Sequence, residues 1–179
     1  MSHLNVELKA RCADPAHVRR VLDEAGADFR GVDEQRDVYF QVPMGRLKLR
    51  RGTIERALIF YQRADAAEVK PSHVTMAKEL DPGLLAPLED ALTTMLGAVN
   101  VVEKKREIRF VGNVKFHLDE VPGLGAFVEI EAIESPEVRS EEALREQCET
   151  WRRRLGIAPL DLVAHSYTDL VSTSPGRHP

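Results

Sequence analysis

Apolar and polar residues alternate along much of the chain with a period of two. This is the period of a β-strand that has one packed face and one polar face. In Leu4–Cys12, apolar side chains occupy one set of alternate positions and polar side chains occupy the other. The same alternation recurs in Arg46–Arg51, Ala57–Arg63 and Val99–Val111. We therefore expect several antiparallel strands, each with one face on a core.

The stretch Val114–Ile133 shows the pattern most clearly, as two strands joined by a glycine-containing turn at Pro122–Gly125. Its apolar residues Val128 and Ile130 share one face. If the opposite, polar face is enclosed, its converging carboxylates favour a hard divalent cation. The residues expected on that polar face are Lys115, His117 and Asp119 on the first strand, and Phe127, Glu129 and Glu131 on the second.

Helices are predicted where the period changes to that of an amphipathic helix. An aspartate followed by proline starts the first two, and glycine ends them. The predicted helices are Ala16–Ala25, a second from Asp81-Pro82 to Gly97, and Ser140–Leu155. Further extended segments are predicted at Phe29–Val42 and around His73–Leu80. We interpret residues 1–171 as one domain that closes with Leu160–Val171, and Ser172–Pro179 as a disordered tail.

The composition narrows the class of protein. The chain has 179 residues, 43% of them hydrophobic and 30% charged, which is typical of one soluble domain. Its formal net charge of −4 argues against a protein that mainly binds nucleic acid or an acidic membrane. Cys12 and Cys148 lack metal-site spacing, so we expect buried, inert thiols. With no secretory signal and no apolar run of membrane-spanning length, a cytoplasmic protein is expected, and a homodimer is left open.

The charged residues on the alternating faces are not evenly mixed. For any single strand, a solvated face is the simpler interpretation. Several strands together favour a sheet curled around a wet interior with a basic wall and an acidic corner. Such a cavity suits a polyanion bridged by metal. The bases are Lys9, Arg11, Lys48, Arg50, Arg63, Lys104 and Arg106, and the acids are Glu7, Asp119, Glu129 and Glu131.

A series of short motifs follows in order along nearly the whole chain. They are Asn5–Lys9 (NVELK), Leu47–Arg50 (LKLR), Tyr61–Arg63 (YQR), Val102–Arg106 (VEKKR), His117–Val121 (HLDEV), Leu124-Gly125, Phe127–Glu131 (FVEIE) and Ser166–Leu170 (SYTDL). Each motif alone is weak, but the ordered set resembles the CYTH superfamily of triphosphate tunnel metalloenzymes. The resemblance is greatest to its class IV adenylyl cyclase-like branch.

The resemblance implies an α+β fold, with a closed antiparallel eight-stranded β-barrel, or tunnel, and flanking helices. It also implies a triphosphate-containing small-molecule substrate and a divalent metal, Mg²⁺ or Mn²⁺. The implied metal ligands are Glu7, Asp119, Glu129 and Glu131. The implied substrate-binding bases are Lys9, Lys48, Arg50, Arg63, Lys104 and Arg106, to which alternation adds Arg11. Of the polar residues, Lys9, Arg106 and His117 are assigned to catalysis.

Some positions depart from the family pattern or allow more than one role. Asn5 stands where the family signature ExExK has its first glutamate, which removes a negative charge and leaves metal affinity open. His117 is expected to orient Asp119, with nucleotide binding or proton relay as the alternative. Tyr167 and Asp169 are expected to fix the C-terminal segment to the barrel. The pattern leaves the roles of Asp37, Tyr39 and Tyr61 open.

Three functions follow from these expectations. The first is a metal-dependent triphosphatase, in which water attacks the terminal phosphoryl group. The second is a class IV-type adenylyl cyclase that converts ATP to cyclic AMP and pyrophosphate. The third is a non-catalytic nucleotide or polyphosphate binder. The acids Glu7, Asp119, Glu129 and Glu131 argue against it, because a simple anion binder would bind better without them. We favour hydrolysis, because it demands fewer special features than cyclisation.

Overall fold

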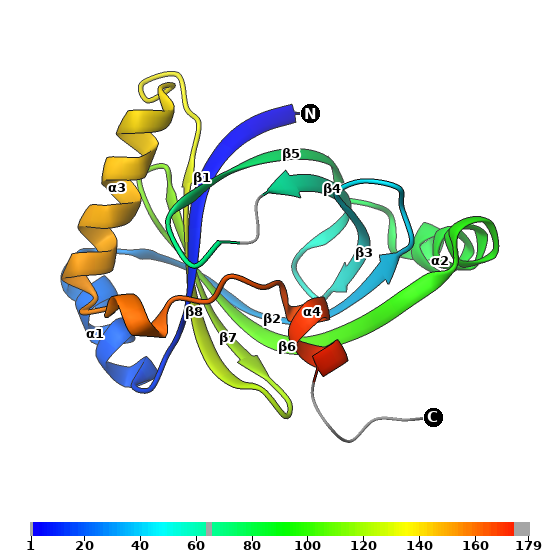
Figure 1. The fold of residues 1–179 in the computed structure, drawn as a ribbon, viewed down its shortest axis with the longest axis horizontal. Helices are drawn as coiled ribbons and strands as arrows, with labels where there is room; N and C mark the ends of the chain where they lie inside the picture. The colour runs from blue at the N-terminus through cyan, green and yellow to red at the C-terminus, as the bar shows by residue number, and fades with distance from the viewer. Residues whose placement is uncertain (1, 64–65, 174–179) are drawn as a thin grey trace.

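The computed structural model describes residues 2–63 and 66–173, and its centre is a closed barrel of eight antiparallel strands (Figure 1). This confirms the fold predicted from the sequence. Around the barrel the strands follow the order β1-β5-β4-β3-β2-β6-β7-β8. Their bounds are β1 Ser2–Arg11, β2 Asp28–Phe40, β3 Arg46–Gly52, β4 Arg56–Arg63, β5 Lys70–Lys78, β6 Ala98–Val111, β7 Val114–Val121 and β8 Gly125–Ile133.

The first strand closes the barrel by pairing with β5 on one side and β8 on the other. Its register with β8 sets Glu7 opposite Glu131 and Lys9 opposite Glu129. Because successive side chains of a strand point to opposite faces, this register turns all four charged side chains to the same side. That side is the barrel interior, where the charged motifs of several strands meet.

Helices lie outside the barrel, with α1 (Pro15–Glu24) and α3 (Glu141–Arg154) on one side and α2 (Pro82–Leu96) on the other (Figure 1). The two predicted caps are present, because Asp14 accepts from the His17 amide and Asp81 from that of Gly83. Ser140 caps α3 in the same way by accepting from the Ala143 amide. A 3₁₀ turn at Pro159–Asp161 leads to α4 (Tyr167–Thr173). The first two residues of the predicted tail are therefore helical, and residues 174–179 lie outside the described part.

The main hydrophobic core lies between the barrel and the helices, on the outer faces of β1, β7 and β8. Leu144 of α3 is fully buried there, and the Trp151 ring meets that of Phe116 edge-on at 4.8 Å. Cys148 is buried, as predicted, and donates from Sγ to the Val6 carbonyl at 3.0 Å. Burial raises the pKa of its thiol to about 12, which disfavours the reactive thiolate. Cys12 is only half-buried, contrary to expectation. Because this core lies outside the barrel, the inner faces of the strands can carry polar residues.

A smaller core joins α2 to the outer faces of β2 and β3, where Leu85 and Leu92 pack on Val38 and Leu49. None of the helices in the described part of the chain has the length and apolar character needed to cross a membrane.

Candidate functional site

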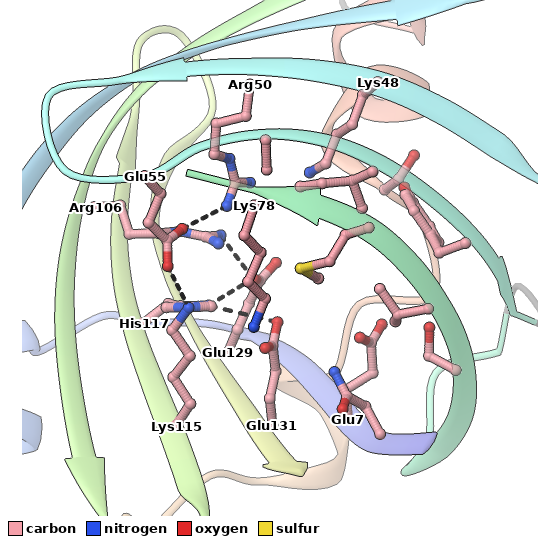
Figure 2. Close-up of a pocket in the computed structure, with 18 of the residues that line it drawn as sticks. Glu7, Lys48, Arg50, Glu55, Lys78, Arg106, Lys115, His117, Glu129 and Glu131 are labelled. Atoms are coloured by element: carbon pink, nitrogen blue, oxygen red, sulfur yellow. Dashed lines mark hydrogen bonds and ion pairs between the residues drawn. The ribbon is translucent and has the colours of Figure 1, made fainter. Parts of the chain in front are cut away.

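The inner faces of the strands enclose a cavity of about 340 Å³, within the size range of small-molecule sites. Figure 2 shows charged side chains from several strands pointing into it. Cations outnumber carboxylates along its wall, so the cavity attracts polyanions. The cations are Lys9, Lys48, Arg50, Arg56, Lys78, Lys104, Arg106 and Lys115, and the carboxylates are Glu7, Glu55, Glu79, Glu129 and Glu131.

Three of the cations meet at one buried carboxylate, that of Asp37 on β2. It accepts hydrogen bonds from Lys48 Nζ at 2.9 Å, Arg50 Nε at 2.9 Å and Lys104 Nζ at 3.0 Å. The register of β2 with β3 sets Asp37 opposite Arg50. Burial alone would raise the pKa of Asp37, but the three cations hold it well below its usual range. Asp37 therefore stays ionised and clusters the cations along one side of the cavity.

Lys104 has a weakened affinity for its proton. Burial lowers the pKa of its amine to about 7, and the neighbouring Arg106, Arg50 and Lys48 add to the shift, although Asp37 opposes it. Near neutral pH the free protein therefore holds Lys104 only partly charged. A polyanion in the cavity would favour the charged form.

A carboxylate from a loop completes this side of the site. Glu55 accepts hydrogen bonds from Arg50 NH1 at 2.8 Å and from Lys115 Nζ at 2.5 Å. Burial would raise the pKa of Glu55, but these two cations lower it. Asp33 holds the loop by accepting from the amides of Ile54 at 2.7 Å and Glu55 at 3.0 Å. A Cβ at Gly52 would lie 2.6 Å from Asp33 Oδ1, so the loop requires glycine there.

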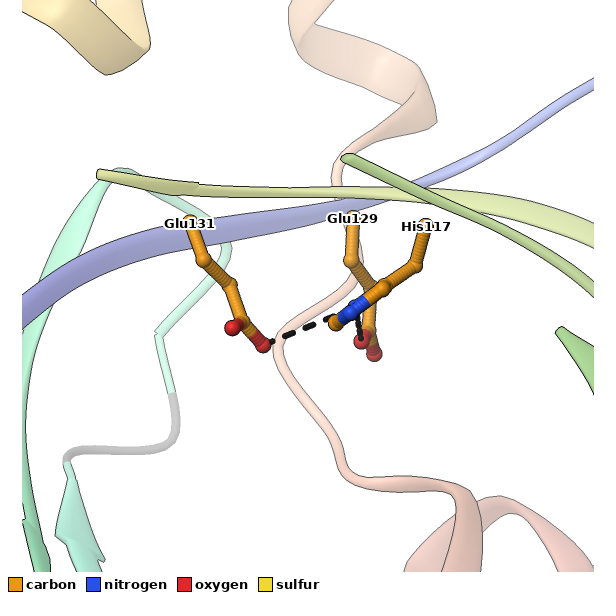
Figure 3. A group of neighbouring side chains, drawn as sticks. All are labelled: His117, Glu129 and Glu131. Atoms are coloured by element: carbon orange, nitrogen blue, oxygen red, sulfur yellow. Dashed lines mark hydrogen bonds and ion pairs between the residues drawn. The ribbon is translucent and has the colours of Figure 1, made fainter. Parts of the chain in front are cut away.

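The acidic corner consists of His117 on β7 and of Glu129 and Glu131 on β8 (Figure 3). His117 Nδ1 lies 3.2 Å from Glu129 Oε2 and 3.6 Å from Glu131 Oε1. The register pairs His117 directly with Glu129, so the expected partnership of His117 with Asp119 is wrong. One ligand atom from each of the three side chains lies within 4.8 Å of the other two. Such a group is compatible with a single divalent cation.

Asp119 is buried behind this corner, where it holds Arg106 in place. Arg106 Nε donates to Asp119 Oδ1 at 2.6 Å, and the same guanidinium reaches Glu129 Oε2 at 2.7 Å. Tyr167 Oη donates to Asp119 Oδ2 at 2.7 Å. Burial raises the pKa of Tyr167 well above its usual value, and Asp119 and Glu129 add to the shift, so the hydroxyl keeps its proton. Lys9 Nζ lies 2.9 Å from Glu129 and 3.5 Å above the centre of the Tyr167 ring.

The C-terminal segment is fixed to the barrel by Tyr167 and Asp169, as the sequence predicts. The Tyr167 ring packs edge-on against Phe127, with ring centres 5.2 Å apart. Asp169 accepts from Arg46 NH2 at 2.8 Å and from the Ser166 hydroxyl at 2.6 Å. This segment thus brings Tyr167 to the wall of the cavity.

Two buried polar atoms of residues that line the cavity suit a cation. Within the described residues, nothing hydrogen-bonds to Asn5 Oδ1 or to His117 Nε2. Burial lowers the pKa of His117, and Arg106 lowers it further, so the neutral imidazole has a lone pair. Asn5 itself is 4% exposed and lines the cavity beside Glu7. Carboxylate and amide oxygens with one imidazole nitrogen form a donor set that fits a divalent metal.

The structure brings most of the predicted site residues together, with three exceptions. Arg11 is exposed, and its NH1 group donates to the Leu124 carbonyl at 3.3 Å. Asp119 lies behind Arg106 and does not line the cavity. The side chain of Arg63 lies outside the described residues. The predicted residues that line the cavity are Glu7, Lys9, Lys48, Arg50, Lys104, Arg106, His117, Glu129 and Glu131.

Sequence reasoning missed several residues of the cavity wall. Glu55 lies in a turn that carries no periodic signal, so only the tertiary structure reveals it. Lys115 was expected on the polar face of its strand but was given no role. Lys78 at the end of β5 and Asp37 behind the wall were not assigned either. For Lys115 and Asp37, alternation with neighbouring site residues was the available signal.

Comparisons with known proteins agree with this geometry. The CYTH domain family matches residues 3–167. No curated protein matches the chain by sequence. The PH1012 protein from Pyrococcus horikoshii has a similar structure, with 27% identity, a TM-score of 0.77, and coverage of 93% of this chain and 98% of that chain.

Two further structures share the fold. A putative adenylate cyclase from Vibrio parahaemolyticus is 21% identical, with a TM-score of 0.73 over 97% of this chain and 100% of its own. A putative adenylyl cyclase from Hippeastrum with a dominant triphosphatase activity is 17% identical, with a TM-score of 0.56 over 90% of this chain and 91% of its own.

Proposed function

The chain belongs to the CYTH family, and from that premise we propose that it is a divalent-metal-dependent triphosphatase that hydrolyses a triphosphate-containing small molecule. One observation supports this above all. A single enclosed cavity carries a basic wall held by Asp37 and, apart from it, an acidic corner at His117, Glu129 and Glu131. A plain anion site gains nothing from carboxylates, whereas a metal-assisted phosphoryl site needs both groups.

The basic residues would hold the phosphate chain. Arg50 and Arg106 present planar guanidinium groups that match phosphate oxygens, and the carboxylates behind them limit their side-chain freedom. Lys48 and Lys104 supply compact charges beside Arg50. We assign Asp37 and Asp119 as positioning residues, because each binds the cations from behind the wall.

The acidic residues would hold the metal, with Glu129, Glu131 and His117 as ligands and Glu7 and Asn5 beside them. A divalent cation supplies Lewis-acid polarisation of a phosphoryl oxygen when it is bound there. Lys9 and Arg106 contact Glu129, and we propose that they stabilise charge that develops on a phosphoryl group held beside it. Their assignment to catalysis stays a prediction.

Hydrolysis is preferred over cyclisation, because it needs only a water with access to the terminal phosphorus. In the reaction the water oxygen bonds to that phosphorus, the bond to the bridging oxygen breaks, and diphosphate or a nucleoside diphosphate leaves. The Hippeastrum protein of similar fold, with its dominant triphosphatase activity, supports the same choice.

Product analysis tests the proposal directly. We would incubate the purified protein with ATP or tripolyphosphate and with Mg²⁺ or Mn²⁺, and separate the products by ion-exchange chromatography. Metal-dependent release of inorganic phosphate is expected. Cyclic AMP with pyrophosphate would identify a cyclase instead, and no turnover of any triphosphate would leave a non-catalytic binder.

A matched pair of variants tests the site. Glu129→Gln removes a charge from the acidic corner, and we expect it to lower turnover by roughly 10- to 100-fold and to raise the metal concentration needed for half-maximal rate. Glu120→Gln, an exposed change of the same kind on β7, should have no effect. Equal rates in both variants, with unchanged circular dichroism, would refute the assignment of the acidic corner.

A further inference from the structure

One sector of the cavity wall is apolar, although it lies among charged residues. It is formed by inward-facing side chains of β4 and β5 and is called the β4–β5 wall below. The register places Ile59 opposite Met76, and Tyr61 opposite Val74. Its members that line the cavity are Ala57, Ile59, Tyr61, Val74 and Met76.

The boundary between the basic and apolar sectors runs between two neighbouring strands. Lys48 on β3 pairs with Ile59 on β4, and Arg50 pairs with Ala57. Each base therefore has an apolar side chain as its direct neighbour on the inner face. Lys48 Nζ also lies 5.8 Å from the centre of the Tyr61 ring. A ligand held by Lys48 and Arg50 would have one end beside this wall.

The β4–β5 wall lies opposite β6 and β7, whereas β8, which carries Glu129 and Glu131, is two strands from β5 across β1. In the order of strands around the barrel, β4 lies four strands from β7, and β5 lies four strands from β6, in either direction. The wall thus faces the strands that carry His117 and Arg106 across the cavity. A molecule spanning the cavity would place its two ends in chemically different surroundings.

The apolar side chains do not belong to the cores beneath the helices. Ile59 and Val74 form a separate cluster with Ala57 and Tyr61, and Met76 packs against it. An apolar wall beside water costs free energy in proportion to its area. A polyphosphate alone gains nothing from it, because apolar side chains offer no charge and no hydrogen bonds to phosphate oxygens.

We propose that the β4–β5 wall binds an organic ring, so that the substrate is an organic triphosphate of the nucleoside type rather than inorganic tripolyphosphate. This inference rests on the proposed function, because it takes a triphosphate as the occupant of the cavity. The phosphate chain would lie along Lys48, Arg50 and Arg106 toward the acidic corner. The ring would pack on Ile59 and Val74, beside the Tyr61 ring.

Binding in the absence of metal tests the inference separately from turnover. Calorimetric titrations in EDTA would compare ATP, CTP and tripolyphosphate, with turnover excluded. Charge alone would make tripolyphosphate bind most tightly, because it is the most highly charged of the three compounds. We expect ATP or CTP to bind at least about tenfold more tightly than tripolyphosphate, which is the scale of about one buried methylene group. Equal or tighter binding of tripolyphosphate, or no binding of any of the three, would overturn the inference.

Substitutions on the two faces of β4 localise the effect. Ile59→Thr should weaken ATP or CTP binding about tenfold and leave tripolyphosphate binding unchanged. Leu58→Thr, on the outer face of the same strand, is the control and should alter none of the three affinities. If Ile59→Thr does not fold, Val74→Thr replaces it, because it keeps the shape and changes only a methyl to a hydroxyl. Equal weakening of all three ligands would overturn the inference.

The two proposals fail in different ways. The inference fails if ATP and CTP do not bind more tightly than tripolyphosphate, whether or not the protein hydrolyses any of them. The proposed function fails if none of the three compounds is hydrolysed with Mg²⁺ or Mn²⁺, even where ATP binds more tightly than tripolyphosphate.

Discussion

Replacement of Asp37 by asparagine removes the charge that holds Lys48, Arg50 and Lys104 together. The carboxylate is fully buried, and its oxygens lie 2.9–3.0 Å from the three cations. Breaking a buried charge pair by removing one partner costs about 3–5 kcal/mol. For a chain of this size, one kcal/mol shifts Tm by about 2–4 °C. We therefore expect Asp37→Asn to lower Tm by about 6–20 °C at pH 7.

The pH dependence and the effect of anions make this prediction specific. The pKa of Asp37 is lower in the folded protein, so its contribution is complete above its unfolded pKa of about 3.9 and is lost as pH falls toward the folded value. The difference in Tm between wild type and variant should therefore shrink below about pH 4. Sulfate or tripolyphosphate should raise Tm more in the variant, because the anion replaces the missing negative charge.

Calorimetric or fluorescence melting curves measure both effects. Asp28→Asn on the same strand is the control, because Asp28 and Arg30 form an exposed ion pair that contributes little. If Asp37→Asn melts within a degree or two of the Asp28→Asn control, or if anions stabilise wild type and variant equally, the cations do not depend on Asp37 as argued.

Two further predictions concern metal and proton binding. Asn5→Glu should tighten Mn²⁺ binding about tenfold, because it adds an anionic oxygen beside Glu7. Titration of the free protein with Mn²⁺ measures this affinity, and an unchanged value would show that position 5 lies outside the metal site. Tripolyphosphate binding at pH 7 should take up as much as about half a proton, because the pKa of Lys104 is about 7 and a nearby polyanion raises it. Binding enthalpies in buffers of different ionisation enthalpy report this uptake, and Lys104→Arg, whose side chain stays charged, should abolish it.

The local pattern of polar and apolar residues was sufficient to predict most of the helices and strands and the face on which each strand carries its charged residues. Alternation fixed which face of each strand was polar, and the aspartate-proline starts located α1 and α2. These signals are local, because they depend on the period of the backbone and on the bonds of the first helical turn. Closure of the barrel came from the family resemblance, since no local rule decides which strands pair at the seam.

The tertiary structure decided which charged residues act together. Asp119 alternates with His117 on the same face of β7, yet it lies behind Arg106, whereas His117 joins Glu129 across the strands. Glu55 reaches the cavity from a loop that Asp33 holds in place, and Asp37 gathers cations from two other strands. Residue type and period set a side chain's chemistry and the face on which it lies. Its partners depend on register and loop path, which are fixed only when distant strands pair.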